Sequence, residues 1–143
     1  MADNNPQIIP MLAYENGIEA MAWLCKAFGF TEKMKMLDEN AKLMHGELEF
    51  GGGTIMLASP TEDYQSPKHH RQLCELSAKW YQSPYIINGV LVYVDDVEAH
   101  YRQAKEHGAI FLSGIETGGP GPRYRVEDLE GQRWMFIQME LSI

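Results

Sequence analysis

The sequence contains one helical segment twice, and this duplication constrains the fold more than any other feature of the chain. The segment at 16–30 reads NGIEAMAWLCKAFGF, and the segment at 95–109 reads DDVEAHYRQAKEHGA. Identical residues recur at one constant separation, as for Gly29 and Gly108 (108 − 29 = 79). Self-similarity at a fixed separation is typical of a duplicated structural unit. Two copies favour a pseudo-twofold pair over a longer repeat array.

Each copy has the residue types that begin and end an α-helix. In the first copy, Asn16 is a predicted N-cap, Glu19 completes a capping box, and Gly29 follows the last turn. In the second copy, Asp95 and Glu98 have the same predicted roles. Apolar residues recur at helical spacing in the first copy, which predicts one buried face: Ile18, Met21, Leu24, Cys25 and Phe28.

The repeat extends beyond the helix on both sides. Residues 11–14 line up with 90–93, and residues 50–57 line up with 129–136. Alternating apolar and polar residues predict three further strands after each helix. The sequence therefore predicts an α+β fold of two tandem βαβββ units. The predicted strands are 7–14, 31–37, 43–50 and 54–58 in the first unit, and 85–94, 110–115, 123–129 and 132–138 in the second.

An insertion separates the two units, and we expect one domain over residues 1–143. Unit one is predicted at 7–59, the insertion helix at 60–84 and unit two at 85–140. Within the insertion, Ser66 is a predicted N-cap, Pro67 occupies the first helical position and Pro84 ends the helix. This helix is expected to pack on a sheet face or a partner chain, or to cover a pocket. Its predicted apolar stripe is Leu73, Leu76 and Trp80.

Composition indicates a soluble globular protein. The 143 residues are 45% apolar and 22% charged, and no apolar run approaches the ~20 residues of a membrane helix. The first residues lack the pattern of a signal peptide, and the two cysteines, Cys25 and Cys74, fit a reducing compartment, so we expect a cytoplasmic protein. The net charge of −8 disfavours nucleic-acid and anionic-membrane partners and suits a cationic ligand.

Two motifs resemble those of the vicinal oxygen chelate superfamily, which includes glyoxalase I, extradiol dioxygenases and the fosfomycin- and bleomycin-resistance proteins. VDDV at 94–97 leads from a strand into a helix, and EDLEGQRW at 127–134 is similar to the superfamily's Asp-Pro-x-Gly-x-x hairpin. The resemblance covers residues 7–138 and is strongest to the glyoxalase-like and bleomycin-resistance-like branch. It implies that the two units form a half-barrel cavity lined by both copies, and that the protein is a homodimer.

The resemblance also implies where a metal would bind. Metal-using members take His or Glu ligands from the first and last strand of each unit, where a divalent cation polarises a substrate oxygen. Here those positions fall near 9–10 and 89–90, and at Met56 and Met135. Because these residues are not ligands for a hard metal, we expect no metal or other cofactor and an apolar pocket floor. A shift of one residue still reaches only Met11, Ile55, Leu57, Trp134 or Phe136.

One group of polar residues remains, and two interpretations of it are possible. Period-two spacing places His45, Glu47 and Glu49 on one strand face, with neighbours ~6–7 Å apart. If that face lines the cavity, His45 and Glu47 are candidates for acid–base catalysis or for binding a cation. If it faces solvent, which alternation favours, the three are a solvated stripe opposite a core face. That core face would comprise Met44, Leu48 and Phe50. His100 and His107 are expected at the surface, whereas His69 and His70 are adjacent on the insertion helix, diverge by ~100° and do not readily share a metal.

Aromatic residues form the second group of candidates. They could stack on a planar or cationic ligand, although such residues more often pack in a core. Arg125 and Arg133 are expected to pair with Glu127 or Asp128. The aromatic candidates are Trp80, Tyr93, Tyr124 and Trp134.

These features support three hypotheses. The first is a metal-independent binder of a small organic molecule, cationic or aromatic, similar to bleomycin-resistance-type sequestration proteins. Its ligand-binding residues would be Glu49, Met56, Trp80, Tyr93, Tyr124, Trp134 and Met135. The second is a metal-dependent lyase, isomerase or dioxygenase with its metal relocated to His45 and Glu47. The third is an interaction module whose insertion helix docks on a partner.

Overall fold

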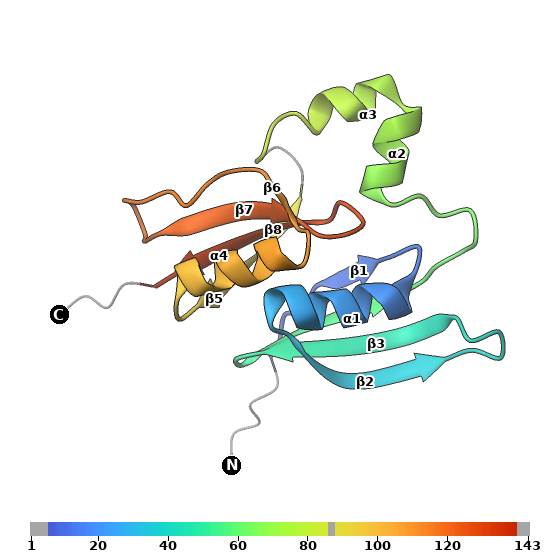
Figure 1. Cartoon of the computed structure of the whole chain (residues 1–143). Helices are drawn as coiled ribbons and strands as arrows, with labels where there is room; N and C mark the ends of the chain where they lie inside the picture. The colour runs from blue at the N-terminus through green and yellow to red at the C-terminus, as the bar shows by residue number, and fades with distance from the viewer. Residues whose placement is uncertain (1–5, 86–87, 140–143) are drawn as a thin grey trace, which may run out of the picture. The chain divides into compact units, whose positions relative to one another are not determined.

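The computed structural model describes residues 6–85 and 88–139, and the chain divides into two compact units, Met1–Ser66 (unit one) and Pro67–Ile143 (unit two) (Figure 1). Unit one contains a four-stranded sheet in the order β1-β4-β3-β2, with β1 parallel to β4 and the other neighbours antiparallel. Its elements are β1 (Met11–Ala13), α1 (Gly17–Phe28), β2 (Thr31–Leu37), β3 (Leu43–Phe50) and β4 (Gly53–Ala58).

Unit two repeats this arrangement in a sheet of order β5-β8-β7-β6. Together the two units confirm the α+β class and the predicted βαβββ order, while the single-domain boundaries stay a prediction. The elements of unit two are α2 (Pro67–Leu73), α3 (Glu75–Trp80), β5 (Gly89–Val94), α4 (Val97–Glu106), β6 (Ile110–Phe111), β7 (Arg123–Glu127) and β8 (Arg133–Gln138). Several strands are shorter than predicted, and in the first strand of this unit residues 86–87 lie outside the described residues.

The helix caps confirm one prediction and correct another. The Asn16 side chain accepts a hydrogen bond from the main-chain N–H of Glu19 (3.2 Å), and Gly29 has the left-handed φ of 81° that ends α1. In α4 the N-cap is Asp96, not Asp95, and its carboxylate accepts from the N–H of Ala99 (3.1 Å). The second helix therefore begins one residue later than the constant separation predicts.

In unit one, the predicted apolar face of α1 packs on one face of the sheet. Ala20, Met21, Leu24 and Phe28 are buried, whereas Ile18 and Cys25 are only half-buried. The sheet residue beneath Met21 is Gly46, where an added Cβ would lie 2.6 Å from the Met21 sulfur. Leu48, Ile55 and Leu57 complete this core. A larger residue at position 46 would require the Met21 side chain to move.

The core of unit two is aromatic. From α4, Val97, His100 and Ala104 are buried against the sheet. His100 was expected at the surface, but it is 8% exposed, and its Nδ1 lies 2.6 Å from the hydroxyl of Tyr124. The imidazole can be buried because this hydrogen bond gives its Nδ1 atom a polar partner. The sheet contributes Tyr124, Val126, Trp134 and Phe136.

The insertion contains two short helices, not the single helix that was predicted. The chain bends at Cys74, which has an extended backbone (φ −135°, ψ 111°) between α2 and α3. Within this chain the predicted stripe is largely exposed: Leu73, Leu76 and Trp80 are 65%, 55% and 49% exposed. Among the described residues, no helix has the length and apolarity needed to cross a membrane.

Candidate functional site

Helix α1 covers one face of the first sheet, and we call the opposite face the open face of unit one. Paired residues on neighbouring strands direct their side chains to the same face. Glu47 pairs with Met56 and with Met34, and His45 pairs with Met36, so all five lie on the open face. Met11 of β1 pairs with Met56, so the open face extends onto β1. The open face therefore combines thioether side chains with a histidine and carboxylates.

His45 and Glu47 form a pair on this face. Nε2 of His45 lies 2.7 Å from Oε2 of Glu47, and the two side chains are 34% and 17% exposed. Glu49 is exposed farther along β3. The favoured interpretation of a solvated stripe thus fits Glu49, whereas His45 and Glu47 are partly buried beside methionines. The two side chains are within hydrogen-bonding distance of each other.

A register shift explains an error in the predicted core face of β3. Between Met36 and Leu37 the pairing with β3 slips, so that Leu37 pairs with Leu43. Leu43 is consequently buried (1% exposed) while Met44, predicted in the core, is 57% exposed. Strict alternation fails where a bulge adds a residue to one strand.

The positions expected to hold a metal carry apolar side chains. Met56 and Met135 are two of the expected positions, and they pair with Met11 and Leu91 of the neighbouring strands. Over residues 6–85 and 88–139, no group of three His, Cys, Asp or Glu side chains is placed to hold a metal ion. His45 and Glu47 would supply two ligands, whereas a catalytic zinc site uses three from the protein. The expectation of a metal-free site stays a prediction.

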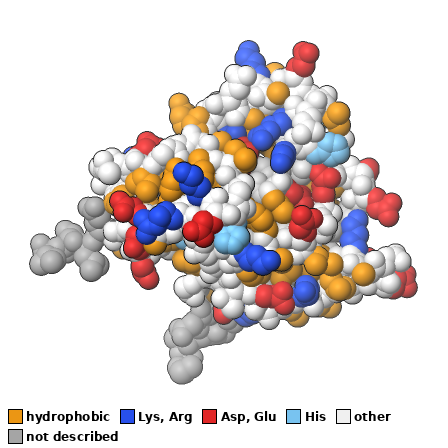
Figure 2. Space-filling model, in the orientation of Figure 1, with side chains coloured by type: hydrophobic (Ala, Val, Ile, Leu, Met, Phe, Trp, Pro, Cys, Tyr) orange, Lys and Arg blue, Asp and Glu red, His pale blue; other side chains and the backbone are white. Residues whose placement is uncertain are grey.

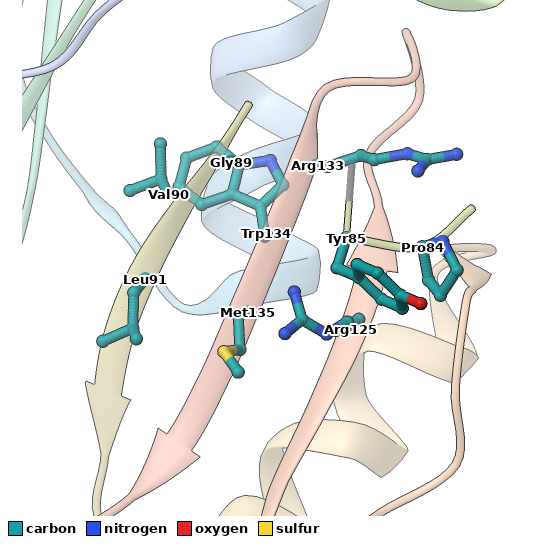
Figure 3. A pocket seen from close by; sticks show the side chains of 9 residues that line it. All are labelled: Pro84, Tyr85, Gly89, Val90, Leu91, Arg125, Arg133, Trp134 and Met135. Atoms are coloured by element: carbon teal, nitrogen blue, oxygen red, sulfur yellow. The ribbon is translucent and has the colours of Figure 1, made fainter. Parts of the chain in front are cut away.

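Unit two contains a cavity of about 220 Å³ on the side of its sheet where Arg125, Met135 and Leu91 project (Figure 3). Figure 3 shows the Arg125 side chain beside the ring of Tyr85, with the guanidinium group directed towards Met135. The guanidinium carbon lies 6.0 Å from the Tyr85 ring centroid. Met135, a predicted ligand-binding residue, therefore lines a cavity. Pro84, Gly89, Val90, Arg133 and Trp134 complete the lining.

Two of the aromatic candidates are buried in the core of unit two. Tyr124 and Trp134 are 0% and 1% exposed, so they offer a ligand almost no surface, although Trp134 forms part of the cavity wall. Burial also raises the pKa of the Tyr124 hydroxyl well above its ordinary value, which keeps this group protonated. Tyr93 on β5 and Trp80 on α3 are exposed by about half (54% and 49%), outside the lining of this cavity.

A buried carboxylate connects the insertion to the sheet of unit two. Glu127 is 1% exposed and pairs with Arg133 (3.0 Å), as predicted, and also with Arg71 of α2 (2.7 Å). The Glu127 carboxylate raises the pKa of Arg71, and burial raises the pKa of Tyr81. Both guanidinium groups lie over the Tyr81 ring, at 5.3 and 4.8 Å from its centroid. Neither Arg71 nor Tyr81 was predicted, because no local pattern links residues so far apart in the sequence.

The predicted hairpin at 127–134 is organised by Asp128. One carboxylate oxygen accepts from the N–H groups of Glu130 and Gln132 (both 3.0 Å), and the other accepts from the Trp134 indole (3.1 Å). Gly131 occupies the turn with a φ of 89°. The motif on which the resemblance rests is therefore a turn closed by a single buried acid.

One face of the molecule shows how its surface charges are distributed. On the face seen in Figure 2, acidic and basic side chains are intermingled over the described residues. Such a surface contrasts with the continuous basic patch that nucleic-acid binding requires.

Comparison with known proteins gives relatives that align with most of this chain and solved structures that share its fold. Mb0911c of Mycobacterium bovis, an uncharacterized protein, is 27% identical over 138 residues, which cover 93% of this chain and 83% of that protein. The crystal structure of TioX from Micromonospora sp. ML1 has a TM-score of 0.68 and 25% identity, covering 96% of this chain and 99% of TioX. TnmS3, an antibiotic binding protein from Streptomyces sp. CB03234, shares the fold at 14% identity (TM-score 0.61, covering 94% and 98%). Residues 11–136 match the Glyoxalase/Bleomycin resistance protein/Dioxygenase superfamily, and the chain belongs to that superfamily.

Proposed function

We propose that this protein binds a small organic molecule, cationic or aromatic, without a resident metal. The observation that carries the proposal is the chemistry of the paired strand positions, Met11 with Met56 and Leu91 with Met135. Thioether and alkyl groups are poor ligands for hard divalent cations but good contacts for apolar surface. The shared fold of TnmS3, described as antibiotic binding, adds support by analogy only.

The open face of unit one suits a ligand of this kind. Methionine side chains are flexible and polarisable, so they adapt to flat or irregular apolar groups. Glu47 and Glu49 on the same face supply negative charge for a cationic group. The net charge of −8 acts in the same direction at longer range.

The proposal includes a homodimer and a cytoplasmic location. The dimer follows from the resemblance to the superfamily, and the location from the reducing compartment that two free cysteines, Cys25 and Cys74, favour. Light scattering coupled to size-exclusion chromatography gives the mass in solution directly. A mass near 16.3 kDa, that of one chain, would exclude the dimer.

Binding is tested by calorimetric titration of chelator-treated protein with a panel of aromatic and cationic compounds that includes bleomycin. We expect micromolar affinity for at least one compound, unchanged by the chelator. Met56→Ala should weaken that binding because it removes a thioether from the open face, whereas Met139→Ala, which alters an exposed methionine beyond β8, should not. Absence of binding across the panel, or binding only after a metal is added, contradicts the proposal.

A second candidate function rests on the His45–Glu47 pair. Its 2.7 Å contact suits a general base with its orienting carboxylate, or two ligands of a relocated metal in a lyase, isomerase or dioxygenase. Elemental analysis of purified protein separates this candidate from the first. A stoichiometric divalent metal that is lost in His45→Ala and retained in His70→Ala, which changes an exposed histidine of α2, would favour the enzyme.

A further inference from the structure

We propose that the cavity of unit two binds the carboxylate of an organic anion and that Arg125 is the residue that recognises it. This inference rests on the small-molecule binding proposed above and specifies the charge of one group of the ligand. It also differs from the cationic preference that the net charge of the chain suggests.

The guanidinium group of Arg125 has donors available. Within residues 6–85 and 88–139, its side chain makes no hydrogen bond or ion pair, and its one described side-chain interaction is with the ring of Tyr85, at 6.0 Å. A guanidinium carries five N–H donors in a planar fork that matches the two oxygens of a carboxylate. Arg125 is half-buried on β7 and lines the cavity. Among the described residues Arg125 therefore has no acidic partner, and its donors are available to the carboxylate of a ligand.

Arg133 lines the same cavity, but each of its three side-chain nitrogens already donates to a protein acceptor. Its Nε donates to Glu127 (3.1 Å), and its two terminal nitrogens donate to the carbonyl oxygens of Ser83 (2.5 Å) and Tyr81 (2.6 Å). Glu127 in turn is satisfied by Arg71 and Arg133, so it does not compete for Arg125. Of the two arginines that line the cavity, Arg125 is therefore the one whose donors are available to a ligand.

The remaining walls favour an apolar body attached to the carboxylate. Tyr85 and Pro84 lie on one side of Arg125, and Leu91 and Met135 on the other (Figure 3). These groups reduce the water around the guanidinium, which strengthens its attraction for an anion. The volume of about 220 Å³ lies below the ~300–1,000 Å³ of sites for drug-sized ligands. The cavity therefore suits a small aromatic acid, or the acidic end of a larger molecule.

Three probes with the same ring test the charge preference: benzoate, benzamide and benzylamine. Each is titrated into ¹⁵N-labelled full-length protein while the amide signals of Leu91 and Met135 are followed. We expect benzoate to shift both signals and to bind at least about tenfold more tightly than the other two, as charge-assisted hydrogen bonds would give. Equal affinities, tighter binding of benzylamine, or no shift with benzoate would overturn the inference.

Variants then assign the effect to Arg125. Arg125→Gln should weaken benzoate binding about tenfold or more and leave benzamide within twofold, and Arg125→Lys should give an intermediate loss because it keeps the charge without the fork. The matched control is Arg102→Gln, which removes the same charge from the exposed face of α4 and should leave benzoate binding within twofold. Thermal unfolding verifies that each variant folds. Equal losses in the Arg125 and Arg102 variants would overturn the assignment.

This inference and the proposed function fail in different ways. If benzoate is rejected while a compound of the broader panel binds, the anion site is wrong and small-molecule binding stands. If benzoate binds through Arg125 but only after a metal is added, the anion site stands and the metal-free function is wrong.

Discussion

Two N–H groups of Arg71 donate to the two carboxylate oxygens of Glu127, over 2.7 and 2.9 Å, and this bidentate pair attaches the insertion to the sheet of unit two. Arg133 approaches the same carboxylate from β8. The acid is 2% exposed in its side chain, so its charge depends on both guanidinium groups for compensation.

Removing that charge should destabilise unit two. Glu127→Gln leaves Arg133, 4% exposed, without its anion, and breaking a buried ion pair from one side typically costs about 3–5 kcal/mol. Urea unfolding of the variant and the wild-type protein measures the difference. Glu98→Gln in the first turn of α4 is the surface control, and a Glu127→Gln loss no greater than the control would contradict this account.

A second prediction separates backbone strain from a steric clash. Gly131 and Gly108 have nearly the same φ, 89° and 82°. A Cβ at Gly131 would lie 2.7 Å from the main-chain nitrogen of Lys68, whereas a Cβ at Gly108 would meet nothing within 4 Å. Both alanine variants should lose about 1 kcal/mol to the left-handed backbone, and Gly131→Ala should lose more.

Thermal or urea unfolding of the two alanine variants gives the comparison. The extra loss in Gly131→Ala should accompany displacement of α2, because the N–H of Lys68 donates to the carbonyl of Glu130 (3.0 Å) at the start of that helix. Equal losses of stability in the two variants would show that α2 can shift away from position 131 without a loss of stability.

The hydrogen bond between Tyr124 and His100 gives a third prediction. Tyr124→Phe leaves the buried imidazole without this partner (2.6 Å in the wild type) and should cost about 1–3 kcal/mol at pH 7. The matched control is Tyr101→Phe on α4, whose hydroxyl has no described hydrogen bond among residues 6–85 and 88–139. A loss in Tyr124→Phe no larger than in the control would mean that the hydrogen bond is not stabilising.

The same tyrosine predicts a pH dependence. Burial raises the pKa of Tyr124 above its ordinary 10.0, so the folded state retains a proton that the unfolded state releases. Stability from this group is therefore complete below pH 10 and declines as pH rises above 10. Tyr124→Phe should show a smaller decline than the wild-type protein when unfolding is measured at pH 9 and pH 10.5. Parallel declines would contradict the assignment.

Cys25 should react slowly with alkylating agents. Burial, with a smaller contribution from the Glu32 carboxylate, raises the pKa of its thiol, so less of the reactive thiolate is present at pH 8. In Cys74→Ser, which leaves Cys25 as the one thiol, iodoacetamide should react more slowly than with a free cysteine and should accelerate in alkali. A rate equal to that of the free amino acid at pH 8 would show that the thiol is not shielded.

The duplication made the fold predictable from the sequence, but not every register. Helix caps and the alternation of a strand depend on residues that are close in the sequence, and the repeat contains both patterns twice. The constant separation nevertheless fails by one residue at the start of the second unit. Met11 and Leu91 pair equivalently, with Met56 and Met135, but they are separated by 80 positions (91 − 11 = 80). The second helix, which follows this strand, also begins one residue later than predicted. A one-residue insertion of this kind can be recognised only once the strand pairing is known.

The candidate site was less predictable, for physical reasons. Whether an alternating strand directs Tyr124 and Trp134 into the core depends on which face the helix covers, and alternation itself does not say. The pair of Arg71 with Glu127 joins residues 56 positions apart. That Arg125 has no ion pair within the described part of the chain became evident only once the partners of Arg133 were known.

The ion pairs of Glu127 also bear on how this chain can change over generations. A lineage that shortened or lost the segment between the two copies would lose Arg71 and leave a desolvated acid in the second copy. Arg133 would remain as a partner of that acid, and neither residue of this buried pair can be lost alone without cost. Related chains that lack the segment should therefore either keep both Glu127 and Arg133 or replace both.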